Sequence, residues 1–128
     1  NTLGKNPLIL RCPAMLGKHM KSNNVYKLIN DKEAKLSLTK DSEFNYILHS
    51  DILNFILFSY DWLVKGIIDF TSSKNITLEA VVEILNAKPN YGNYKFSTPL
   101  VSNKTLIKYN KDLNKTSKEV FNQFLKQL

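Results

Sequence analysis

The chain of 128 residues is long enough to fold as one domain around its own core, and 43% of its residues are hydrophobic. Its 18 basic and 11 acidic residues give a net charge of +7, which favours acidic partners such as nucleic acid or phosphorylated protein. The lone Cys12 excludes an internal disulfide, and no apolar run is long enough to span a bilayer. We therefore expect a soluble domain of a larger protein that makes no membrane contact.

The first part of the chain predicts three strands and one helix. Apolar residues that are continuous or alternate with polar ones predict strands over residues 8–12, 34–39 and 44–49. Pro13 ends the first strand because proline cannot continue a central ladder, and Gly17 marks a turn. A helix is predicted over residues 19–30, where apolar residues recur at helical spacing.

The middle of the chain predicts a buried strand that turns directly into a helix. Residues 55–58 are four consecutive large apolar residues, which is typical of a strand covered on both faces. Ser59 is a candidate helix N-cap, and apolar residues at helical spacing predict a helix from about Trp62 to Phe70.

This strand, Ser59 and the tryptophan helix resemble the segment before the last helix of BRCT domains, in which the tryptophan is a core residue. The resemblance implies an α/β fold with a four-stranded, mainly parallel sheet flanked by helices. Only residues 51–54 separate two of the strands, so the resemblance is to a variant without the second helix, of the kind found in a silent-chromatin scaffold. The implied plan is one domain over residues 1–128, with a core over 7–70 and a helical C-terminal extension over 71–128 packed on it.

The resemblance also names core residues. Trp62 is expected to be buried against the parallel sheet, between the strands of Leu8 and Phe55. The expected structural core consists of Leu10, Phe55, Leu57 and Trp62.

Two helices are predicted in the C-terminal part. Thr77 is a candidate N-cap for a helix over residues 78–86, and residues 94–96 form a short candidate edge strand. Thr116 and Glu119 have the spacing of a capping box at the start of the last helix. The apolar stripe of that helix either packs on the domain or forms an exposed surface for a partner.

The sequence offers little for catalysis. His19 and His49 are too few for a metal site, and Cys12 has no CxxC neighbour. No P-loop, glycine-rich dinucleotide turn or GxSxG elbow is present. We therefore predict no catalytic residue, no metal ligand and no cofactor, and a protein that is not an enzyme.

A phosphate site is implied by the BRCT resemblance. Phosphopeptide-binding members hold phosphate with a hydroxyl residue and a glycine after the first strand and with a lysine from the second helix. Gly17 matches the glycine, whereas Leu16 stands in place of the hydroxyl residue. The predicted phosphopeptide-binding residues are Arg11, Gly17, Lys18 and Lys21, which would converge at the start of the first helix. The alternative is that these basic residues are ordinary surface charges.

The predicted function is a nuclear adaptor that recognises phosphorylated or acidic segments of chromatin or DNA-repair partners, including partners in heterochromatin silencing. The main alternative is nucleic-acid binding, in which phosphates meet the basic surface and exposed tyrosines stack on bases. Candidate stacking residues are Tyr91, Tyr94 and Tyr109. A host-interaction or toxin-immunity protein is a third reading.

Overall fold

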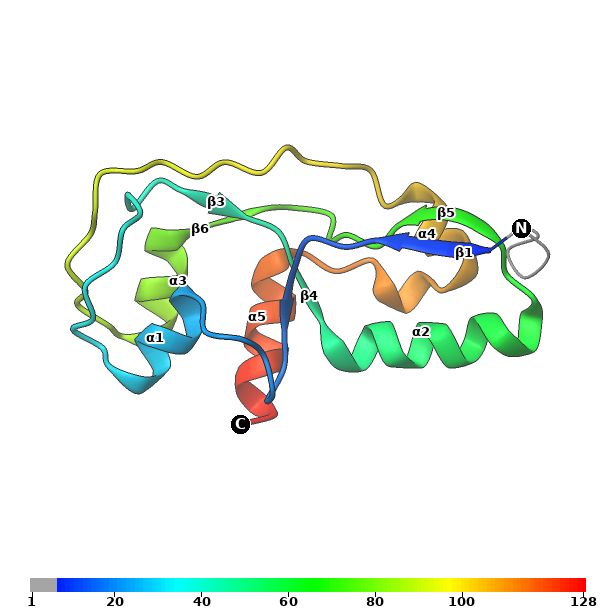
Figure 1. The fold of residues 1–128 in the computed structure, drawn as a ribbon, viewed down its shortest axis with the longest axis horizontal. Coiled ribbons are helices and arrows are strands. Elements are labelled where there is room, and N and C mark those ends of the chain that lie inside the picture. Colours follow the sequence, from blue (N-terminus) through cyan, green and yellow to red (C-terminus); the bar gives the residue numbers. More distant parts are fainter. Residues whose placement is uncertain (1–6) are drawn as a thin grey trace.

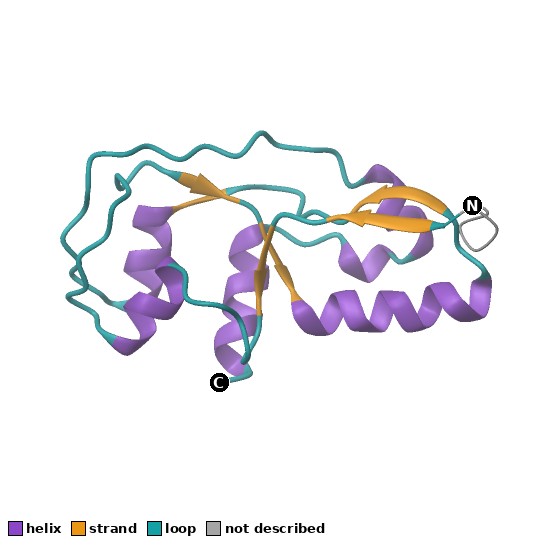
Figure 2. Cartoon of the chain, in the orientation of Figure 1, coloured by secondary structure: helices purple, strands orange, loops and turns teal. Residues whose placement is uncertain are grey.

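The structure is a computed structural model that describes residues 7–128. It is an α/β fold in which parallel strands are flanked by helices, as predicted (Figure 1, Figure 2). The elements in chain order are β1 (Leu8–Arg11), β2 (Ala14–Leu16), α1 (Asn24–Asn30), β3 (Glu43–Phe44), β4 (Tyr46–Leu48), α2 (His49–Trp62), β5 (Gly66–Asp69), β6 (Ile76–Thr77), α3 (Leu78–Leu85), α4 (Lys104–Tyr109), the 3-10 helix η1 (Lys111–Leu113) and α5 (Ser117–Lys126).

The strands pair in twos. The β1–β5 and β2–β4 pairs are parallel, and the β3–β6 pair is antiparallel. The described residues therefore form three two-stranded sheets and not the predicted four-stranded sheet. Figure 1 shows β1, β5, α2 and α4 at one end of an elongated molecule, α1 and α3 at the other end, and β4 and α5 between them.

Local capping explains where several helices begin. The Asn23 side chain accepts a hydrogen bond from the Tyr26 N–H at α1, and the Thr77 hydroxyl accepts one at α3. Thr116 and Glu119 form the complete capping box at α5. The predicted caps at Thr77 and Thr116 are thus confirmed, whereas α1 begins later than residue 19 because a turn precedes it.

The prediction for residues 55–70 is wrong, because helix and strand occur there in the opposite order. Residues 55–58 lie inside α2, and the segment after Trp62 contains β5. The Ser59 hydroxyl donates to the Ile56 carbonyl inside the helix and does not cap one. Leu63 ends α2 in the left-handed conformation with φ 53°, and Gly66 with φ 96° leads into β5.

The hydrophobic core consists of two clusters. The first joins α1, α3 and α5 to β2 and β4, and the second joins α2 and α4 to β1 and β5. Residues on both sides of residue 70 contribute to each cluster. The stripe of α5 packs on the first cluster through Val120, Phe121 and Phe124, which confirms the packing alternative for this helix. Within residues 7–128, none of the helices has the length and apolar character needed to cross a membrane.

Only part of the predicted core is buried. Phe55 is 2% exposed, and Leu10 is half-buried against the second cluster. Leu57 is 59% exposed and Trp62 is 73% exposed, so their predicted burial is wrong. The reason is helical geometry: Phe55 faces the core from α2, while Leu57 points away from it. Trp62 lies at the end of the helix and stacks on Phe58, with 5.9 Å between ring centroids.

Candidate functional site

Each parallel strand pair leads into a cleft at its carboxyl end. β1 and β5 end at Arg11 and Asp69, and β2 and β4 end at Leu16 and Leu48. Ligands of open α/β folds bind outside the carboxyl ends of parallel strands. Both clefts are therefore candidate sites, and their chemistry distinguishes them.

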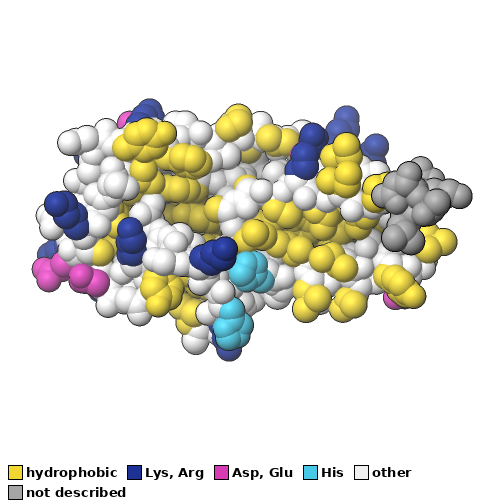
Figure 3. Space-filling model, viewed as in Figure 1, with side chains coloured by type: hydrophobic (Ala, Val, Ile, Leu, Met, Phe, Trp, Pro, Cys, Tyr) yellow, Lys and Arg dark blue, Asp and Glu magenta, His cyan; other side chains and the backbone are white. Residues whose placement is uncertain are grey.

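The cleft after β2 and β4, here called the histidine cleft, has a volume of about 460 Å³. Lys21 lines it with an ammonium group, and His19 and His49 line it with imidazole rings. No carboxylate of residues 7–128 lines it. Figure 3 shows the two histidines next to each other, with basic side chains alongside. Its lining residues are Met15, His19, Met20, Lys21, Ser22, Asn23 and His49. This combination of positive, polar and apolar groups suits an anion that carries an apolar part.

Gly17 positions one of these histidines. A Cβ atom on Gly17 would overlap the imidazole ring of His49, so the ring lies directly against the glycine backbone. His49 is the first residue of α2 and follows β4 without a loop. Its half-buried ring is thus fixed between the end of a strand and the turn after β2.

The cleft after β1 and β5, here called the arginine cleft, has a volume of about 450 Å³. Its cation is already paired: Arg11 Nε donates to Asp69 Oδ1 at 2.8 Å and Arg11 Nη2 donates to Asp69 Oδ2 at 3.1 Å. The hydrogen bond to Asp69, and then its charge, raise the pKa of Arg11 above its ordinary value. Two further polar groups that line the cleft, the Asn45 amide and the Thr71 hydroxyl, also have partners within the protein. The arginine cleft is therefore less suited to an anion than the histidine cleft.

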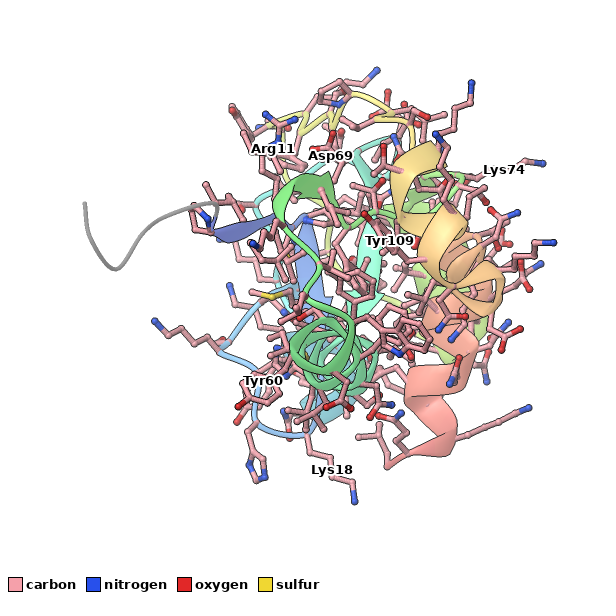
Figure 4. The ribbon with its side chains drawn as sticks, turned by 90° about the vertical axis from the view of Figure 1, so that its right-hand side faces the viewer. Arg11, Lys18, Tyr60, Asp69, Lys74 and Tyr109 are labelled. Atoms are coloured by element: carbon pink, nitrogen blue, oxygen red, sulfur yellow. The ribbon has the colours of Figure 1, made fainter. Side chains whose placement is uncertain are left out.

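The structure separates the predicted phosphate residues. Gly17 and Lys21 lie at the histidine cleft, and Arg11 lies in the other cleft with Asp69. Figure 4 shows Lys18 pointing away from the body of the protein, far from Arg11. The predicted convergence of Arg11 with the two lysines is thus not seen. The reason is that Asp69, which is distant in sequence, binds Arg11.

His49 lines the histidine cleft although the sequence analysis did not select it as a site residue. The sequence feature that could have identified His49 is its position directly after an apolar strand. Ligands bind outside the carboxyl ends of parallel strands, so a polar side chain at that position is a candidate site residue. Among residues 7–128, no group of three His, Cys, Asp or Glu side chains could hold a metal ion. Desolvation by neighbouring protein atoms raises the pKa of the Cys12 thiol.

No protein-family model matches the sequence, and neither does any curated protein. Solved structures do match it. UDP-N-acetylglucosamine 4-epimerase from Methanobrevibacter ruminantium, in complex with UDP-N-acetylmuramic acid, matches 98% of this chain at a TM-score of 0.67 and 15% identity. The enzyme WbmG from Bordetella bronchiseptica, in complex with NAD and UDP, matches 95% at a TM-score of 0.64 and 10% identity. UDP-N-acetylglucosamine 4-epimerase from Bacillus cereus matches 91% at a TM-score of 0.64 and 12% identity.

This chain spans less than half the length of these structures: 48%, 44% and 44% of the three chains. At such identities the likeness establishes the fold, which is that of part of a UDP-sugar epimerase and is consistent with a Rossmann-like architecture.

The matches correct three predictions. The BRCT resemblance is wrong, because the matched structures are epimerases and an enzyme crystallised with NAD and UDP. The phosphopeptide-binding adaptor in chromatin or DNA repair is wrong for the same reason, and the matches do not support the nucleic-acid alternative. The expectation of a protein that is not an enzyme is also wrong, because epimerases are enzymes. Tyr91, Tyr94 and Tyr109 are exposed as predicted, but exposure alone does not make them stacking residues. The nuclear location stays a prediction.

Proposed function

We propose that this chain is the sugar-nucleotide-binding part of an enzyme with the UDP-sugar epimerase fold. The observation that carries the proposal is the match over 98% of the chain to an epimerase in complex with a UDP-sugar. A second match is to an enzyme in complex with UDP as well as NAD. Both ligands are nucleotides, and the net charge of +7 favours such anions.

The residues of this chain do not fit NAD. A dinucleotide site of the Rossmann type needs a glycine-rich turn directly after the first strand of a multi-stranded parallel sheet. The sequence has four glycines and no such turn, and the described residues form two-stranded sheets. Because the matched structures are more than twice as long as the matched part, we assign dinucleotide binding to a different part of the enzyme.

The histidine cleft is the best candidate for the sugar nucleotide. A diphosphate needs hydrogen-bond donors that are not already paired with carboxylates, and the Lys21 ammonium group with the ring nitrogens of the two histidines meets this need. Met15 and Met20 offer apolar contacts for a base, and Ser22 and Asn23 offer hydrogen bonds for hydroxyl groups. The role of this chain is therefore to bind and orient the nucleotide.

Calorimetric titration of the chain with UDP, UDP-N-acetylglucosamine and NAD tests the proposal. We expect saturable binding of both uridine nucleotides and none of NAD. Lys21→Ala removes one charge-assisted contact, worth about 1.5–3 kcal/mol, and should weaken UDP binding about tenfold or more. The matched control is Lys74→Ala, an exposed lysine far from Lys18 in Figure 4, which should change binding less than about twofold. Equal losses from both variants, or binding of NAD without UDP, would overturn the proposal.

A further inference from the structure

Helix α4 and the start of η1 carry a basic stripe on the side that faces solvent. Its members have the spacing i, i+3, i+4 and i+7 of one helix face and are Lys104, Ile107, Lys108 and Lys111. Leu106 points the other way and is buried in the second core cluster. The three lysines are exposed, and Figure 4 shows side chains tipped with nitrogen that project into solvent beside α4. The packing of Leu106 thus turns the lysines outward together.

A groove of about 440 Å³ lies along this stripe, and we call it the lysine groove. It is lined by the four residues of the stripe and by Asn114. Ile107 is half-buried and supplies the apolar part of the lining. No carboxylate of residues 7–128 lines the groove, because Asp112 faces the neighbouring groove beside α5. Three positive charges therefore share one concave surface that holds no negative charge.

The lysines of the groove form no salt bridge within the described part of the chain. Other lysines do: Lys40, Lys95 and Lys115 pair with Glu79, Asp41 and Asp51. Helix α4 also has no acidic residue in its first turn. Like charges four residues apart on a helix repel each other and destabilise it. An anion bound between these lysines would remove that repulsion.

Asn114 adds an uncharged donor to the lysine groove. Its Oδ1 accepts a hydrogen bond from Asn103 Nδ2 at 3.4 Å, and its own Nδ2 group can donate to a ligand. Each lysine ammonium group offers three further donors and binds phosphate as a point charge. The histidine cleft contains one lysine, whereas the lysine groove contains three. The lysine groove therefore suits a ligand with more negative charge than the histidine cleft does.

We propose that the lysine groove binds a ligand with two or more adjacent phosphate groups. Lys104 and Lys108 are one helical turn apart, with Cβ atoms separated by about 5–6 Å, so their long side chains can reach neighbouring phosphates. The groove shares no lining residue with the histidine cleft, and the inference does not depend on the function proposed above. Adjacent phosphates occur both in free polyphosphates and in lipid head groups, and the experiment distinguishes these two sources.

Calorimetric titration of the protein with inorganic tripolyphosphate tests the inference. We expect saturable binding at one site, and Lys108→Ala should weaken it about tenfold or more. The variant should stay folded by circular dichroism, because alanine favours a helix. The matched control is Lys88→Ala, an exposed lysine after α3 at the opposite end of the molecule (Figure 1), which should change the affinity less than about twofold. Absence of saturable binding, or equal losses from both variants, would overturn the inference.

Two further titrations identify the ligand and the site. Inorganic monophosphate should bind about tenfold or more weakly than tripolyphosphate, since it contacts fewer ammonium groups, and equal affinities would count against the groove. Lys21→Ala should leave tripolyphosphate binding nearly unchanged. A loss in this variant and not in Lys108→Ala would place the ligand in the histidine cleft and refute the inference. Failure of UDP to bind would refute the function proposed above and leave the lysine groove unaffected.

Vesicles distinguish the two sources of phosphate. Phosphatidylcholine vesicles with and without phosphatidylinositol bisphosphate are sedimented with the protein. Retention that requires the bisphosphate lipid and is displaced by tripolyphosphate supports the inference with a lipid head group as the source. Tripolyphosphate binding without retention supports it with a free polyphosphate as the source. Retention that tripolyphosphate does not displace would show general attraction to a charged surface and would overturn the inference.

Discussion

Asn45 and Ser72 bind each other in both directions, from segments that are distant in sequence. The backbone N–H of Ser72 donates to Asn45 Oδ1 at 2.9 Å, and Asn45 Nδ2 donates to the Ser72 carbonyl at 3.1 Å. Asn45 Nδ2 also donates to Asn75 Oδ1, and the Ser72 hydroxyl donates to the Tyr46 carbonyl. The pair is buried where β3 and β4 meet the segment after β5. It thus fixes the paths of these segments relative to each other.

Replacing Asn45 should therefore destabilise the fold without touching the histidine cleft. Asn45→Ala leaves buried backbone groups of Ser72 without partners, and we expect it to lower the free energy of unfolding by about 1–3 kcal/mol. Urea denaturation followed by circular dichroism measures the change. Asn122→Ala, at an exposed position of α5, is the control and should not destabilise. A loss of similar size in both variants would contradict the role of the Asn45 network.

Phe55 and Trp62 lie on the same helix but should respond differently to truncation. Phe55 is fully enclosed, so Phe55→Ala should cost about 3–5 kcal/mol of stability. Trp62 mainly loses its stacking on Phe58, so Trp62→Ala should cost about 1 kcal/mol or less. Thermal melts of the two variants measure this, and tryptophan fluorescence of the unmodified chain should be that of a solvent-exposed ring. A buried-type emission or a larger loss for Trp62→Ala would contradict the exposed position of Trp62 at the end of α2.

The sequence predicted those features that depend on near neighbours. The caps at Thr77 and Thr116 were predictable because each hydroxyl accepts from an N–H three residues further on. Residues 55–58 were misread because a short apolar run is compatible with a strand or with a helix that is apolar all round. The packing of Phe55 against the second core cluster, which joins segments distant in sequence, decides between them.

The candidate site was predictable in the same local sense. Gly17 and Lys21 lie near each other in sequence and meet at the histidine cleft. His49 joins them because β4 pairs in parallel with β2, a contact between segments about 30 residues apart. Arg11 does not join these residues. The β1–β5 register places Asp69 directly opposite Arg11, and the two side chains form a salt bridge. Long-range strand pairing, which no motif in this sequence reports, therefore decides which charges share a cleft.

The capping box of α5 should give a distinct pH dependence. Hydrogen bonds from the Thr116 backbone N–H and then from its hydroxyl lower the pKa of Glu119 below its ordinary value of 4.5. A carboxylate with a lowered folded pKa stabilises the fold above its unfolded pKa, and this contribution disappears as the pH falls through the folded value. The stability difference between the unmodified chain and Glu119→Ala should thus be full at neutral pH and shrink below about pH 4.5. An unchanged difference across the acid range, measured by urea denaturation, would contradict this.

The last prediction concerns the contact between Gly17 and His49 in the histidine cleft. A methyl group on Gly17 would overlap the His49 ring, so Gly17→Ala must displace the ring and should lower both the melting temperature and the affinity for UDP. Removing the ring relieves the overlap, so the double variant Gly17→Ala/His49→Ala should be more stable than the sum of the single losses predicts. We expect a coupling of about 0.5–3 kcal/mol, the range for residues in contact. His19 lines the same cleft, and Gly17→Ala combined with His19→Ala should give additive losses. Equal coupling to both histidines would mean that Gly17 affects the cleft as a whole and does not position His49.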